Sequence, residues 1–225
     1  MATAVAPFRA RRFLTPMAAV AGAVAEEVLE AMTTRRQLAR AYVNNGGDIA
    51  LHLAPRETFS IGMVDRPDRP SLFGRATVRA ADRVRGVATS GWRGRSFSLG
   101  AADAVTVLAA SATLADAAAT LIANAVDIPG HPAIRRAPAC DLDPQSDLGE
   151  RRVTVAVGLL AADEIDRALA SGVAEAELWR ERGLIEAVAL RIGDQTRLVG
   201  AAATRSLGRI PAVGRNEEKA LDAVG

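Results

Sequence analysis

Asp116 and Thr120 are the two residues of this chain whose types and spacing best suit a chemical role. They lie four positions apart in the run ADAAAT. On an α-helix, residues with this spacing share one face and lie about one turn apart. A carboxylate and a hydroxyl so placed can both bind one hard cation. We therefore predict a metal site at Asp116 and Thr120.

The same two residues also have a purely structural interpretation. An acidic side chain early in a helix complements the helix dipole, and Asp116 can have that role alone. Thr120 can equally be a packing residue. The neighbouring motifs described below favour the metal site over this alternative.

The composition limits the classes of function. The chain has 225 residues, 49% of them hydrophobic, which is enough for one large domain with its own core. Its net charge is only +2, and its arginines are scattered between acidic residues. The chain also has few aromatic residues to stack on bases, so we do not expect nucleic-acid binding. The single cysteine, Cys140, excludes an internal disulfide and favours a reducing compartment, the cytoplasm.

The N-terminal segment has two interpretations. Arg11 and Arg12, followed by an alanine-rich stretch, resemble a twin-arginine export signal. We favour a folded helix over residues 16–32 instead, capped by Thr15 and with Pro16 in its first position. Its predicted apolar face consists of Val20, Val24, Val28 and Met32. No apolar run approaches the roughly 20 residues that span a bilayer, so no membrane segment is predicted.

Alternating and continuous apolar runs predict the remaining elements. In the N-terminal half we expect strands at residues 41–43, 49–53, 58–64, 75–80, 85–89 and 104–109, and a helix at 114–126 starting at Thr113. We expect a proline-rich loop at 65–70 and an irregular connector at 128–149. The C-terminal part predicts a strand at 153–157, a helix at 161–182 and two strands at 185–192 and 196–201.

These elements predict one domain over residues 1–203. Its core is residues 15–127, the connector follows, and residues 150–203 form a C-terminal α/β part. Residues 204–225 lack periodicity and are predicted to be a flexible tail.

Three motifs in a fixed order resemble the ApbE family of flavin transferases. They are a glycine-glycine-acid turn, a Thr-Ser-Gly loop and an Ala-Asp-Ala-x-x-Thr helix, found here at residues 45–49, 88–91 and 115–120. The resemblance covers roughly residues 16–127, about half of the chain. The sequences of these motifs are most similar to those of the uncharacterised UPF0280 branch of that superfamily.

The resemblance implies an α+β fold of the ApbE-like, T-fold-like kind, with mixed or antiparallel sheets packed with helices. Members of the family take FMN from FAD with Mg²⁺ and attach it to a threonine of an acceptor protein. The resemblance also implies that Asp116 and Thr120 bind Mg²⁺ and that the Asp48 carboxylate hydrogen-bonds a ribityl or ribose hydroxyl. The implied contacts with FAD or FMN are Gly46, Gly47, Asp48, Thr89, Ser90 and Gly91, of which the glycines let backbone N–H groups approach phosphate closely. A plain turn is the alternative for the glycine pair.

The chain also departs from the family pattern. The family has a His-x-x-Asp-Pro-x-Thr-Gly segment where residues 95–100 read RSFSLG, and it has a lysine in the early helix where this chain has Ala or Gly. The N-terminal strands of the superfamily are not found before residue 16, which predicts either a late start or an incomplete sheet. Catalytic residues therefore cannot be named from the resemblance.

We thus expect a protein that binds a flavin or related nucleotide with Mg²⁺. Active FMN transfer to an acceptor protein is one alternative, and a catalytically silent interaction or oligomer-forming protein is another. Arg93 and Arg95 can contact a phosphate or remain solvated, and Trp92 can stack on a ring or simply be half-buried. We assign no role to His52 or His131, which lack partners at ligand spacing.

Overall fold

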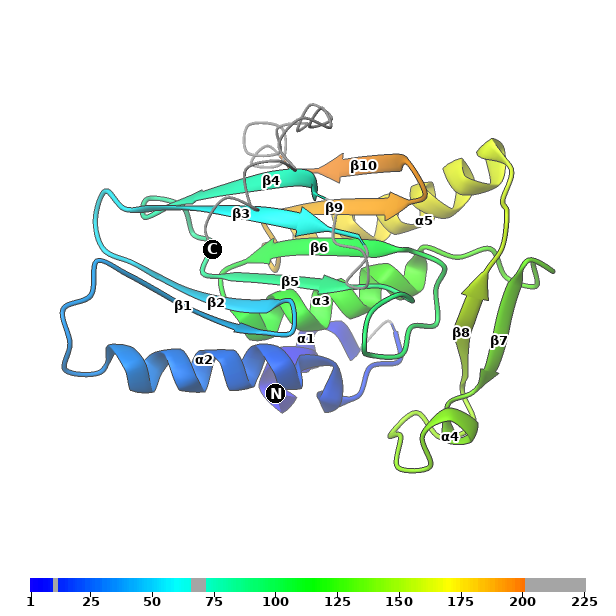
Figure 1. The fold of residues 1–225 in the computed structure, drawn as a ribbon, viewed down its shortest axis with the longest axis horizontal. Coiled ribbons are helices and arrows are strands. Elements are labelled where there is room, and N and C mark those ends of the chain that lie inside the picture. Colours follow the sequence, from blue (N-terminus) through cyan, green and yellow to red (C-terminus); the bar gives the residue numbers. More distant parts are fainter. Residues whose placement is uncertain (10–11, 66–71, 201–225) are drawn as a thin grey trace, which may run out of the picture.

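A six-stranded antiparallel sheet forms the centre of the molecule (Figure 1). The computed structural model describes residues 1–9, 12–65 and 72–200. In spatial order the strands are β1 (Arg40–Asn45), β2 (Asp48–Leu53), β5 (Gly86–Ser90), β6 (Ala104–Ala109), β9 (Ala187–Ile192) and β10 (Gln195–Val199).

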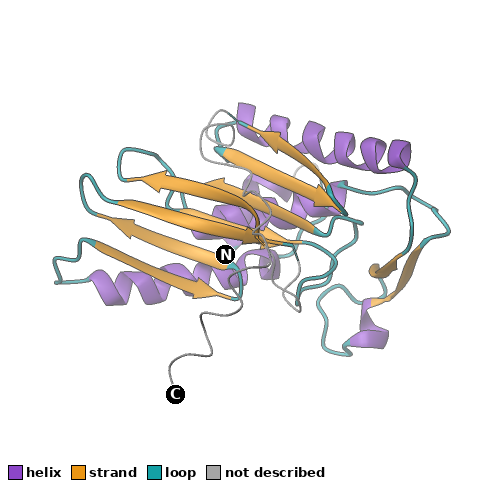
Figure 2. Ribbon diagram, turned by 45° about the horizontal axis from the view of Figure 1, so that its top comes forward, coloured by secondary structure: helices purple, strands orange, loops and turns teal. Residues whose placement is uncertain are grey.

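Helices cover one face of this sheet, as Figure 2 shows. They are α1 (Ala2–Arg9), the 3₁₀ turn η1 (Pro16–Ala19), α2 (Val20–Thr33), α3 (Ala112–Ala125) and α5 (Ala162–Glu181). Val105 and Val107 of β6 point into this layer and join a buried cluster with Ile122 and Leu169. Phe8 and Trp179 meet edge to face within the same cluster, with ring centroids 4.9 Å apart.

A hairpin of β3 (Thr58–Val64) and β4 (Leu72–Arg79) covers part of the opposite face. Its Ala76 and Val78 pack against Val87 and Leu108 of the sheet. The central strand β6 is buried along its whole length because it has cover on both faces. The molecule therefore has three layers, of helices, sheet and hairpin.

A second hairpin forms an arm that projects from these layers (Figures 1 and 2). It consists of β7 (Ile134–Pro138), the short helix α4 (Ala139–Leu142) and β8 (Arg152–Val157). A backbone hydrogen bond from Thr154 N to Ser98 O, 2.8 Å long, links the arm to the loop before β6. The prediction of an irregular connector at 128–149 was wrong here, because long-range pairing with β8 orders residues 134–138.

The predicted fold class, α+β with antiparallel sheets packed against helices, is confirmed. Two details of the helices differ from the prediction. Helix α3 begins at Ala112 rather than at Thr113, because Ser111 is its N-cap and accepts a hydrogen bond from Leu114 N. Helix α1 was not predicted. Arg11, residues 66–70 of the predicted loop and the predicted tail 204–225 lie outside the described residues.

The predicted apolar face of the early helix was wrong. Val24, Val28 and Met32 are exposed, and the inward face of α2 is formed by Gly22 and the larger residues Ala25 and Leu29. The reason is close packing: a Cβ atom at Gly22 would lie 2.4 Å from Ala112 O of α3. Among the described residues, no helix is long and apolar enough to cross a membrane.

Candidate functional site

A cavity of about 840 Å³ lies at the end of the sheet where the β1–β2 turn and the ends of β5, β6 and β9 meet. Its lining includes all eight residues predicted to contact a cofactor or a metal, namely Gly46, Gly47, Asp48, Thr89, Ser90, Gly91, Asp116 and Thr120. Residues from three separate stretches of the chain therefore share one space. Their binding roles stay predictions.

The cavity reaches both faces of the sheet because two strands separate at this end. The β2–β5 ladder contains only the pairs Ile49–Val87 and Ala50–Gly86, so it ends before Asp48 and Ala88. Ile49 and Val87 pack toward the β3–β4 hairpin. Since side chains alternate along a strand, Asp48 points to the helix face. The cavity consequently has a helix-side part and a hairpin-side part.

Helix α3 supplies Asp116 and Thr120 to the helix-side part. Both are half-buried, whereas Ala115 and the three alanines between them are buried. The Gly22 N–H donates a hydrogen bond of 2.9 Å to Asp116 Oδ2, which fixes the carboxylate against α2. The i, i+4 spacing thus places the carboxylate and the hydroxyl at the same cavity, as predicted.

Asp48 belongs to the same helix-side part. Burial, followed by the charge of Asp116, raises the pKa of Asp48 to about 8, although the Thr89 backbone amide and Arg95 act in the opposite direction. Burial likewise raises the pKa of Asp116 to about 6, against the effect of the backbone amides of Gly22 and Ala21. Two neighbouring carboxylates that are costly to ionise together favour a cation between them.

The sequence did not reveal this pairing. Asp48 was predicted to contact a sugar or ribityl hydroxyl, and nothing in the sequence near it indicates that it faces Asp116. In the described part of the chain, no three His, Cys, Asp or Glu side chains are grouped to hold a metal. A cation at Asp48 and Asp116 would therefore need further oxygens, such as the Thr120 hydroxyl and phosphate oxygens.

The glycine turn is held in one conformation by side chains around it. Gly46 and Gly47 have φ angles of +73° and +113°, which suit the two-residue turn between β1 and β2. Gly47 N–H donates to Asn44 Oδ1 at 2.9 Å, and Asn45 Nδ2 donates to Ala21 O at 3.2 Å. The Gly47 N–H is thus already occupied, and a phosphate would have to displace Asn44 to reach it.

The hairpin-side part combines apolar walls with a few polar groups. Ile61, Met63 and Val87 line it, and the Thr89 and Thr106 hydroxyls lie 2.9 Å apart. Asp65, which the sequence did not single out, also lines the cavity.

Arg191 Nε donates to Asp65 Oδ2 at 2.6 Å, while the buried Asp65 Oδ1 has no hydrogen-bond partner among the described residues. A buried acceptor without a partner is unusual in proteins and suits a donor on a ligand.

Trp92 and Arg93 have structural contacts instead of facing the cavity. Trp92 Nε1 and Arg93 Nε both donate to Asp103 Oδ1, at 3.0 and 2.6 Å, and Asp103 Oδ2 accepts from Gly193 N at 2.6 Å. The Arg93 guanidinium lies 4.4 Å from the Trp92 ring centroid. Neither Trp92 nor Arg93 lines the cavity, but Arg95 does.

The two histidines also lie outside the cavity. His131 Nε2 lies 2.9 Å from Glu164 Oε1, and its Nδ1 accepts a hydrogen bond from Ala133 N. His52 Nε2 lies 3.1 Å from Leu38 O. Each therefore has a structural partner, and the sequence did not predict the His131–Glu164 pair.

Comparison with known proteins gives a family match and several relatives. A family model described as AbpE bacteria matches residues 1–198. The UPF0280 protein of Methanopyrus kandleri is 44% identical over 110 residues, which cover 48% of this chain and 42% of the relative. The UPF0280 protein of Methanocaldococcus jannaschii is 38% identical over 111 residues, covering 49% and 44%.

A third relative, the UPF0280 protein of Methanococcoides burtonii, is 35% identical over 131 residues, covering 54% of this chain and 50% of the relative. The chain thus spans about half the length, or less, of the curated relatives that it matches. The predicted likeness to the UPF0280 branch is confirmed.

Proposed function

The chain belongs to the AbpE bacteria family, and from the contents of its cavity we propose that it binds a flavin or a related nucleotide together with Mg²⁺. One observation carries the proposal: two carboxylates, Asp48 and Asp116, and the Thr120 hydroxyl line the same cavity as a glycine turn and the end of β5 at Thr89. Its volume of about 840 Å³ also falls within the range of small-molecule sites.

The helix-side part suits the cation and the phosphates. Asp48, Asp116 and Thr120 offer hard oxygen ligands, and phosphates commonly complete the coordination of Mg²⁺ in proteins. The bound cation would stabilise the ionised form of Asp48, whose pKa is raised by burial and then by the charge of Asp116.

The hairpin-side part suits a heterocyclic ring. Ile61, Met63 and Val87 provide apolar walls for a flat ring. The Thr89 and Thr106 hydroxyls and the buried Asp65 Oδ1 are candidates to bond the polar edge of such a ring.

FMN transfer to an acceptor protein is a more specific function than binding alone. The likeness of the three motifs to ApbE transferases supports it, and a threonine of an acceptor protein would be the recipient. The RSFSLG run at residues 95–100 does not supply the His or the Asp-Pro of that family. We therefore propose binding as the function and transfer as a separate activity to be tested, with FAD and a threonine-bearing acceptor assayed for covalent flavin.

Thermal unfolding tests the proposal. Purified protein with FAD, FMN or ADP, each with and without Mg²⁺, should gain melting temperature with at least one of them, because a ligand of the folded state stabilises it by mass action. The substitution Asp116→Asn should abolish the Mg²⁺-dependent part of this gain in melting temperature.

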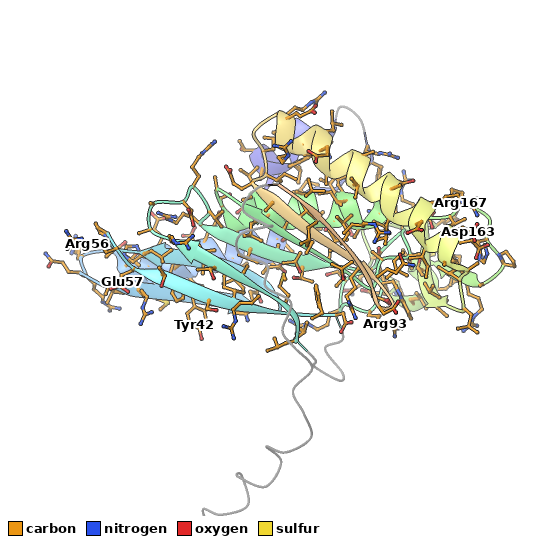
Figure 3. The ribbon with its side chains drawn as sticks, turned by 90° about the horizontal axis from the view of Figure 1, so that it is seen from above. Tyr42, Arg56, Glu57, Arg93, Asp163 and Arg167 are labelled. Carbon is orange, nitrogen blue, oxygen red and sulfur yellow. The ribbon has the colours of Figure 1, made fainter. Side chains whose placement is uncertain are left out.

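The matched control is Asp163→Asn on α5, whose side chain is 77% exposed beside Arg167 (Figure 3). It should respond to the ligands as the wild type does. If Asp116→Asn keeps the full Mg²⁺-dependent gain, the metal assignment is wrong. If no ligand raises the melting temperature of the wild type, the scaffold alternative is favoured.

A further inference from the structure

The Arg95 side chain lies across the glycine turn at the cavity. A Cβ atom at Gly46 would be 1.8 Å from Arg95 Nη2 and 2.9 Å from Cζ, so the guanidinium lies directly over this glycine. Arg95 is exposed and lines the cavity together with Gly46 and Asp48. Its positive charge lowers the pKa of Asp48, which places the two groups within electrostatic reach.

Arg95 differs in its bonding from the neighbouring arginine. Arg93 Nε forms an ion pair of 2.6 Å with Asp103, and both side chains are largely shielded from solvent. Arg95 forms no hydrogen bond or ion pair within the part of the chain that the structure describes. Its five N–H donors are therefore available to an anion that enters the cavity.

The loop that carries Arg95 is fixed by the same helix face that carries the proposed metal ligands. Asn124 lies four residues after Thr120 and eight after Asp116 on α3. Its Oδ1 accepts hydrogen bonds from Leu99 N at 2.8 Å and from Ser98 Oγ at 3.3 Å. One rigid element thus sets both the cation ligands and the end of the Arg95 loop.

We infer that Arg95 binds a phosphate of the ligand on the side away from the cation, so that the cavity selects nucleotides with a diphosphate. This inference rests on the proposed function. A planar guanidinium donates paired hydrogen bonds that match phosphate oxygens. A diphosphate has oxygens enough to contact Arg95 with one phosphate and the Asp116–Thr120 cation with the other. FAD and ADP should therefore bind more tightly than FMN and AMP.

Calorimetric titration with Mg²⁺ present tests Arg95. Arg95→Gln removes the charge, and the affinity for ADP and FAD should fall about tenfold to a hundredfold, as expected for a lost charge-assisted hydrogen bond. Binding of AMP and FMN should fall less, so that the preference for the diphosphate shrinks. Arg95→Lys keeps the charge without the planar fork and should restore part of the affinity.

Arg135→Gln is the matched control, because Arg135 is exposed on β7 in the arm and does not line the cavity. It makes the same change of charge and should leave both affinities unaltered. If Arg95→Gln binds ADP and FAD as tightly as the wild type, the role of Arg95 is refuted while nucleotide binding stands. If the wild type binds none of the four nucleotides, the proposed function and this inference both fail.

Discussion

At the scale of residues, the Asp48–Asp116 pair is the part of the site with the clearest electrostatic cost. Both side chains are half-buried, and burial raises the pKa values of Asp48 and Asp116 to about 8 and about 6. In the unfolded chain, both would titrate near the ordinary aspartate value of about 3.9. Without a ligand, these two carboxyl groups are therefore largely protonated at mildly acidic pH.

This cost predicts how stability depends on pH. Between about pH 4 and pH 8 the folded protein holds more protons on this pair than the unfolded chain does, so the free energy of unfolding falls as pH rises through that window. Urea unfolding without ligand at pH 5.5 and 8 would measure it. Asp48→Asn should flatten the decline, because it removes the group with the larger shift. An identical decline in the variant and the wild type would contradict the assignment.

The residues of the site were predictable only where their relation is local in sequence. Asp116 and Thr120 share a helix turn, so their spacing alone indicated a common face. Asp48 faces Asp116, and Asp65 faces Arg191, through packing of segments that are far apart in the chain. Trp92 and Arg93 likewise donate hydrogen bonds to Asp103, a contact that the local sequence does not indicate.

At the scale of elements, the contact between α2 and α3 positions Asp116. Gly22 lies against the start of α3, and its N–H holds the Asp116 carboxylate. Gly22→Ala would place a Cβ atom 2.4 Å from Ala112 O and 2.8 Å from Thr113 N, both rigid backbone atoms. We expect a loss of about 1–3 kcal/mol in the free energy of unfolding, measured in urea, together with weaker Mg²⁺-dependent ligand binding.

Gly172→Ala on α5 is the matched control for that prediction. A Cβ atom there would meet Val126 Cγ2 at 2.3 Å and Leu190 Cδ2 at 2.6 Å, which are ends of side chains that can shift. It should leave Mg²⁺-dependent binding intact, whatever its effect on stability. If both variants impair binding equally, the effect reports general destabilisation and not the position of Asp116.

The orientation of α2 gives a prediction that separates its two faces. Leu29 is buried against Ala50 and Ala112, whereas Val28 is 43% exposed. Leu29→Ala should cost about 2–5 kcal/mol of unfolding free energy, as large-to-small changes in cores do. Val28→Ala should change it by about 0.5 kcal/mol or less. A larger loss for Val28→Ala would mean that the apolar stripe, and not the glycine face, packs inward.

That stripe also shows what sequence periodicity can and cannot decide. Val20, Val24, Val28 and Met32 correctly indicated a helix, because their spacing is helical. They did not indicate the buried side, since the close approach of α3 selects the small Gly22 and Ala25 instead. In the same way, the five residues of β7 lack a pattern of their own and become a strand only by pairing with β8.

At the scale of the whole molecule, the cavity is where all three layers meet. Its lining includes Ile61 and Met63 from the hairpin, Thr89 and Thr106 from the sheet, and Asp116 from the helix layer. The order of layers could be predicted only in outline, as strands with helices packed on them. The placement of the hairpin depends on Ala76 and Val78 meeting the sheet, which no local pattern specifies.

This arrangement predicts how ligand binding spreads through the fold. A nucleotide with Mg²⁺ in the cavity should join β3 to the sheet and to α3, and amide hydrogen exchange should slow in β3, in the loop after β5 and in the first turns of α3. The arm of β7 and β8 lies outside these contacts and should exchange at the same rate with and without ligand. Protection confined to the arm, or absent from both β3 and α3, would place the ligand elsewhere. Protection of α3 without β3 would mean that the ligand occupies only the helix-side part.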